Sequence, residues 1–194
     1  MSKPVQEEER TREMGTPKPP VYVKLFCGII ASDVSLLEQT VDNLCKKYGE
    51  IDVRSQLWKF DVTDYYEAEM GKNLWKAFVA FMRLCDPVIL SSVKVETNQI
   101  EYEMGVLSEG QLFRRVNLDP GYLDASKIVL ATTKNYSHRI YLRDGIYAEV
   151  TMIFHKGKYR PLEWTYPDFR SGRYDDFFLE CRKKYLADLK ATRQ

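Results

Sequence analysis

The sequence has little of what marks a metalloprotein, a nucleic-acid-binding protein or a membrane protein. Its two histidines exclude a site built from several histidine ligands, and its four cysteines lie far apart without a C-x-x-C pair, which argues against a zinc or thioredoxin-like site. We therefore expect buried, reduced thiols and a cytoplasmic protein. The 29 Lys and Arg residues balance 28 Asp and Glu residues, which leaves no strong positive field to attract nucleic acid. No apolar run approaches the roughly 18 residues of a membrane-spanning helix.

The length of 194 residues suits one globular domain with one large core. Residues 1–20 contain the charged run EEER (7–10) and the proline-rich run TPKPP (16–20), and they offer little apolar surface to bury. Such a segment lacks the apolar stretch of a signal peptide and is typical of a disordered tail. We predict a disordered tail over 1–20 and a single globular domain over 21–194.

The first elements of the domain form a predicted β-α-β unit. Alternating apolar residues predict a strand over 22–30. A capping box of Ser35 and Glu38, followed by an apolar stripe, predicts a helix that ends at Gly49. Extended chain then returns over 51–60.

The middle of the chain is predicted to be helical. The spacing of Leu74, Phe78 and Phe81 predicts a helix that ends near Cys85. An Asp-Pro pair then caps a further helix over 88–104, although its β-branched residues leave a strand as the alternative.

The remainder reads as an antiparallel β-meander closed by a helix. The segment 115–122 is predicted to be a strand that runs into a turn at Asp119-Pro120-Gly121, because proline and glycine suit the central turn positions. Residues 127–133 fit a strand or a helix. A third strand over 159–164 and a helix over 174–189 complete the chain, and Pro161 places that strand at an edge. The fold class is therefore α+β, or α/β.

The segment 138–154 predicts a β-hairpin with the three-residue loop Arg143-Asp144-Gly145. This loop gives one face that is uniformly apolar and one that carries favourable aromatic and charged partners. The predicted pairs are Leu142 with Ile146, Ile140 with Ala148, His138 with Val150, Tyr141 with Tyr147, and Arg139 with Glu149.

Several motifs occur together in a fixed order along the chain. They are FDxTDYYE (60–67), KxxTNxIE (94–101), RVNLDPGYL (115–123), ATTK (131–134), HRIYL (138–142), GIYAEVT (145–151) and WTYPD (164–168). This set resembles the bacterial family called domain of unknown function 4416, over roughly residues 20–188. Members of that family are sometimes labelled GTP-binding proteins. The sequence has no P-loop, since its Gly-Lys pairs at 71–72 and 157–158 lack both the leading glycine and the following hydroxyl residue.

Polar residues of the meander form the candidate ligand site. Three potential cations lie close together in sequence, and two carboxylates come from neighbouring segments, a set that could hold a phosphorylated ligand. These residues are Lys134, His138, Arg139, Asp119 and Glu149. Secondary candidates are Asp64, Asn98, Glu101, Tyr166 and Asp168. Each also has an ordinary structural interpretation, such as a helix cap, a turn or a sheet ion pair.

Two functions remain open at this point. The first is binding of a small molecule, a nucleotide or another phosphorylated ligand, with or without catalysis; the cofactor and any catalytic residue are unknown, and no metal site is expected. The second is a non-catalytic protein-protein interaction module, for which a tyrosine-rich strand face would supply the contacts. A pocket on which Asp119, Lys134, Arg139 and Glu149 converge favours the first function, and a flat aromatic patch favours the second.

Overall fold

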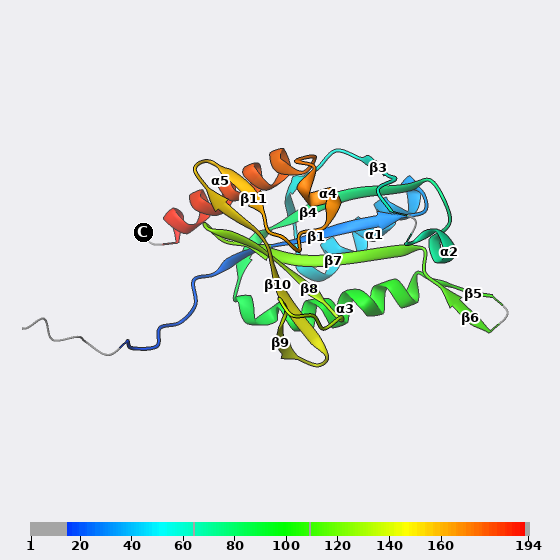
Figure 1. The fold of residues 1–194 in the computed structure, drawn as a ribbon, viewed down its shortest axis with the longest axis horizontal. Coiled ribbons are helices and arrows are strands. Elements are labelled where there is room, and N and C mark those ends of the chain that lie inside the picture. Colours follow the sequence, from blue (N-terminus) through cyan, green and yellow to red (C-terminus); the bar gives the residue numbers. More distant parts are fainter. Residues whose placement is uncertain (1–14, 64, 109, 193–194) are drawn as a thin grey trace, which may run out of the picture.

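The computed structural model describes residues 15–63, 65–108 and 110–192, which form one large sheet between two groups of helices (Figure 1). The helices are α1 (Val34–Tyr48), α2 (Glu67–Met70), the 3-10 helix η1 (Pro87–Ile89), α3 (Leu90–Glu103), α4 (Pro167–Arg170) and α5 (Asp175–Ala191). The strands are β1 (Val23–Ala31), β2 (Ile51–Arg54), β3 (Trp58–Phe60), β4 (Leu74–Cys85), β5 (Val106–Ser108), β6 (Gln111–Phe113), β7 (Val116–Leu123), β8 (Lys127–Thr132), β9 (Ile140–Arg143), β10 (Ile146–His155) and β11 (Lys158–Pro161).

The main sheet has the strand order β11-β10-β8-β7-β1-β4-β2, and β3 and β9 pair with β4 and β10. All of these pairs are antiparallel. Strands β1 and β2 both run antiparallel to β4, which lies between them, so the first strand-helix-strand segment is not a directly paired unit. The fold is thus a mixed α and β structure built on one antiparallel sheet, while β5 and β6 form a separate hairpin.

Each face of the sheet is covered by its own helices. On one face, the alternate residues Cys27 and Ile29 of β1 pack with apolar residues of α1 and α3. On the other face, Phe26 and Phe78 pack against α5, where Phe178 lies with its ring centroid 5.2 Å from that of Phe26. Both faces of the central strands are therefore buried, and each face has its own large apolar cluster.

The helix predicted to end near Cys85 is wrong, because residues 74–85 form the central strand β4. Its residues are buried on both sides, so almost every position from Leu74 to Phe81 is apolar. A strand covered on both faces loses the alternation that identifies strands, and its continuous apolar run also satisfies a helical pattern.

The turn predicted at Asp119-Pro120-Gly121 is also wrong, because all three residues lie within β7. Pro120 has no N–H to donate, and pairing with β8 begins only at the next residue. A Cβ atom on Gly121 would lie 2.4 Å from Val129 O, so glycine is required here for close approach of two strands rather than for a turn.

The hairpin register is confirmed in part. Tyr141 pairs with Tyr147 and Ile140 with Ala148, as predicted, but Arg143 pairs with Ile146. The turn is the two-residue Asp144-Gly145, both with positive φ (55° and 75°), and an extra residue, Leu142, restores the register as a bulge. The face predicted to be uniformly apolar is buried at Ile146, which is 2% exposed, but open at Ile140, which is 69% exposed.

Of the remaining predictions of secondary structure and burial, some are confirmed and some are corrected. Residues 90–103 are helical, and β11 lies at an edge of the sheet. Helix α1 begins at Val34 with Asp33 as its N-cap, not at Ser35. Of the cysteines, Cys27 and Cys181 are buried and the other two are half-buried. Residues 1–14 of the predicted tail lie outside the described residues, and 15–20 are exposed without helix or strand.

Candidate functional site

The main sheet opens between β7 and β8. These strands pair only between residues 121–123 and 128–130, which leaves the earlier part of β7 without a neighbour on that side. Helix α3 supplies the missing partners: Lys94 Nζ donates to Leu118 O (2.6 Å), and the Leu118 N–H donates to Glu101 Oε1 (2.6 Å). Both side chains are buried, and burial raises the pKa of the Glu101 carboxyl. The side chains of Lys94 and Glu101 thus make the hydrogen bonds to the β7 backbone that a neighbouring strand would otherwise make, and they line the opening with polar groups.

A cavity of about 640 Å³ lies at this opening. Side chains of β7, β8 and β10 line it from the sheet, and α3 contributes Lys94, Asn98 and Glu101. Residues of the segments 60–66 and 166–169 close the other sides. The wall combines aromatic rings with charged groups, which is the usual composition of a small-molecule site.

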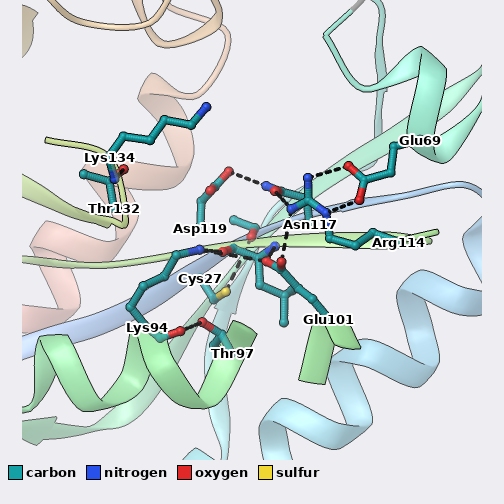
Figure 2. A network of polar contacts seen from close by, with 12 residues as sticks. Cys27, Glu69, Lys94, Thr97, Glu101, Arg114, Asn117, Asp119, Thr132 and Lys134 are labelled. Carbon is teal, nitrogen blue, oxygen red and sulfur yellow. Dashed lines mark hydrogen bonds and ion pairs between the residues drawn. The ribbon is translucent and has the colours of Figure 1, made fainter. Parts of the chain in front are cut away.

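A chain of hydrogen bonds runs along one wall of the cavity and ends at Asp119 (Figure 2). Arg114 binds both oxygens of Glu69 through Nε (2.7 Å) and Nη2 (2.6 Å), and this guanidinium lowers the pKa of the Glu69 carboxyl. Arg114 Nη1 also donates to Glu101 Oε2 and to Asn117 Oδ1, both at 3.1 Å. Asn117 Nδ2 then donates to Asp119 Oδ2 (3.0 Å). The orientation of Asp119 is fixed by this chain.

Lys134 lines the cavity from the segment that follows β8. Its Nζ donates to the phenol oxygen of Tyr65 (2.8 Å) and lies 4.5 Å from the centre of the Tyr65 ring. Among the described residues, no carboxylate lies within 4.0 Å of this ammonium. Lys134 is therefore a cation held by an aromatic residue and not neutralised by an acid.

The buried carboxylate of Glu149 links residues of the segment that follows Lys134 to strand β10. Glu149 is 2% exposed, and its Oε2 accepts from Arg139 Nε (2.8 Å) and lies 3.1 Å from His138 Nε2. Arg139 donates with its other nitrogens to Lys134 O and to Tyr166 Oη, each at 3.0 Å. One arginine thus joins β10, the segment that carries Lys134, and the segment before α4.

A second buried ion pair lines the cavity near α4. Lys76 Nζ donates to Asp168 Oδ2 (2.5 Å) and lies between four aromatic rings, with its nitrogen 4.9–5.2 Å from the ring centres. These rings belong to Phe60, Phe78, Phe169 and Tyr174. Because the Lys76 ammonium is paired with Asp168 and surrounded by aromatic rings, its charge is neutralised within the wall of the cavity.

The structure brings most of the sequence candidates together. Seven of them line the one cavity: Asp119, Lys134, Glu149, Asn98, Glu101, Tyr166 and Asp168. His138 and Arg139 lie behind the wall and contact Glu149. Asp64 lies outside the described residues.

Sequence reasoning missed several residues of the cavity, among them Lys76, Lys94, Arg114 and Asn117. Lys76 was hidden by the wrong helix prediction for 74–85. Lys94 and Asn117 stand inside motifs that resemble the family, so the motifs carried a signal for them that charge patterning alone did not.

Two negative findings concern the described residues only. Within 15–63, 65–108 and 110–192, no three His, Cys, Asp or Glu side chains are arranged to hold a metal ion. In the same ranges, no helix is both long and apolar enough to cross a membrane.

Comparison with known proteins places the chain in a family. The model of the family described as Domain of unknown function (DUF4416) matches residues 21–185. Searches of curated proteins and of solved structures found no significant match. The matched range contains all seven motifs and every residue of the cavity, and it confirms the resemblance seen in the sequence. The chain therefore belongs to the DUF4416 family.

Proposed function

We propose that this protein binds a small phosphorylated molecule in the cavity between β7 and β8. The observation that carries the proposal is the state of Lys134: its ammonium lines the cavity and has the Tyr65 hydroxyl, not a carboxylate, as its side-chain partner among the described residues. A phosphate oxygen is a much stronger acceptor for an ammonium than a phenol is. A cation without an acid partner in a cavity is the arrangement expected for an anionic ligand.

Lys94 supplies a second cation. Its ammonium makes one hydrogen bond, to the backbone oxygen of Leu118, and the Glu101 carboxylate at 3.9 Å is too far away for a second. Lys94 lines the cavity and also forms an ion pair with Glu101 at 3.9 Å, so this second cation is partly neutralised. The cavity volume of about 640 Å³ lies within the range of roughly 300–1,000 Å³ that small-molecule sites occupy.

The exposed hairpin β9–β10 supports protein-protein interaction as a second candidate function. Ile140 is 69% exposed and Tyr141 57% exposed. Arg143 Nε donates to Ser91 Oγ (2.9 Å), which fixes the end of the hairpin to α3. The exposed apolar side chains therefore lie on a hairpin whose end is fixed to helix α3. Loss of co-purifying protein in Ile140→Ser, with ligand retention unchanged, would support this second candidate.

Mass spectrometry of molecules retained by the purified protein tests the first candidate. We expect the wild type to release a phosphorus-containing small molecule on denaturation, and Lys134→Met to release much less of it. Lys72→Met is the matched control, because the Lys72 side chain is 78% exposed and outside the cavity. Equal retention by wild type and Lys134→Met would contradict the proposal.

A further inference from the structure

We infer that Asp119 makes the site selective for phosphorylated polyols, such as sugar phosphates and ribonucleotides, over ligands that offer only a phosphate. This inference rests on the proposed function, because it takes Lys134 to bind the phosphate of the ligand and assigns the hydroxyl groups of the same ligand to Asp119. Its basis is a carboxylate that lines the cavity, is held rigidly and has an oxygen without a donor.

The Asp119 side chain has one hydrogen-bond partner among the described residues. Its Oδ2 accepts from Asn117 Nδ2 at 3.0 Å, and no described donor reaches Oδ1. No described Lys, Arg or His nitrogen lies within 4.0 Å of the carboxylate either. The Asp119 carboxylate is therefore an acceptor with unused capacity on the wall of the cavity.

The orientation of Asn117 is forced by its other neighbour. Arg114 can only donate, so the oxygen of the Asn117 amide must face Arg114 and the NH2 group must face Asp119. Arg114 is in turn fixed by both oxygens of Glu69 and by Glu101. The carboxylate is thus held in place before any ligand arrives, which lowers the entropy cost of binding.

The charges of the cavity specify what the ligand must carry. Among the described residues, Lys134 has no carboxylate partner and Asp119 has no cationic partner, and both line the same cavity. A bare phosphate gains from Lys134 but is repelled by Asp119. A molecule with a phosphate at one end and hydroxyl groups at the other satisfies both, because a hydroxyl donates a charge-assisted hydrogen bond to a carboxylate.

Calorimetric titration with ribose 5-phosphate and with inorganic phosphate tests the inference. A hydrogen bond to a charged group contributes about 1.5–3 kcal/mol, so the wild type should bind ribose 5-phosphate at least about 10-fold more tightly than inorganic phosphate. In Asp119→Asn the new amide must turn its oxygen towards Asn117, which leaves its NH2 facing the cavity. This variant should lose the preference for ribose 5-phosphate and bind inorganic phosphate equally well or more tightly.

The controls distinguish failure of this inference about Asp119 from failure of the proposed phosphate-binding function. Asp42→Asn, an exposed residue on α1, should leave both affinities unchanged. Equal affinities of the wild type for the two probes, or a preference that survives in Asp119→Asn, would overturn the role of Asp119 and leave the phosphate site standing. Binding of neither probe by the wild type, or binding that Lys134→Met does not weaken, would overturn the proposed function itself. Equal affinities of the wild type for the two probes overturn the inference even if a variant fails to fold.

Discussion

Removal of the Arg139 side chain should destabilise the domain far more than loss of a surface charge does. Glu149 is 2% exposed, and its carboxylate accepts from Arg139 Nε (2.8 Å) and Thr151 Oγ1 (3.4 Å) and lies 3.1 Å from His138 Nε2. Arg139→Met leaves a buried carboxylate without its main partner. Breaking a buried pair in this way costs about 3–5 kcal/mol, and we expect the lower value, about 3 kcal/mol, because His138 remains.

A double-mutant cycle of Arg139→Met and Glu149→Gln gives the coupling free energy between the two side chains. Glu149→Gln keeps the shape and an acceptor for Arg139, which also retains Lys134 O and Tyr166 Oη, so that variant should lose about 1.5 kcal/mol. The double variant has no buried unpaired charge and should lose only about 2 kcal/mol, well below the sum of the single losses. The coupling free energy should therefore be about 2–3 kcal/mol.

Urea unfolding of the four proteins measures this coupling. For a domain of this size, a loss of 3 kcal/mol should also lower Tm by about 6–12 °C. The exposed pair Arg54–Glu38 is the matched control, and its cycle should give about 0–1 kcal/mol. Single losses below 1 kcal/mol that add in the double variant would refute the view that the Arg139–Glu149 pair is a buried support of the cavity wall.

Three further outcomes follow from the fold. Gly121→Ala should lose about 2–3 kcal/mol in urea unfolding, because the new Cβ would lie 2.4 Å from Val129 O; unchanged stability would mean that β7 and β8 are less closely packed than described. GTP affinity, if a titration detects any, should be the same in Lys72→Ala and Lys158→Ala as in the wild type, since neither residue lies in a phosphate-binding loop or lines the cavity; loss of binding in either would contradict this. A chain that starts at Val21 should melt within about 2 °C of the full chain, and a larger drop in Tm would show that the removed segment packs on the domain.

Sequence patterns predicted correctly those elements whose conformation is determined by residues close together in the chain. The β9–β10 hairpin was recognisable from its alternating residues around Asp144-Gly145, and α3 from its Asp-Pro start. The turn type was missed because a two-residue turn with a bulge at Leu142 gives the same downstream register as a three-residue loop.

The errors arose where tertiary packing decides the conformation. Strand β4 is almost entirely apolar from Leu74 to Phe81 because helices cover both faces of the sheet, and nothing local distinguishes this run from a buried helix. The Asp119-Pro120-Gly121 segment has the composition of a turn, but its glycine serves the contact with Val129. Arg114 could not be assigned to the site because the split between β7 and β8 exists only in the folded sheet, and Lys76 because its segment was predicted to be a helix.

A crystal structure with a heavy-atom phosphate analogue tests the central claim most directly. Crystals soaked in tungstate should show an anomalous peak in the cavity between β7 and β8, with tungstate oxygens within about 3 Å of Lys134 Nζ. Crystals of Lys134→Met treated in the same way should lack that peak. A wild-type peak confined to other parts of the molecule, or a cavity peak that persists in Lys134→Met, would contradict the claim that this cavity binds phosphorylated ligands through Lys134.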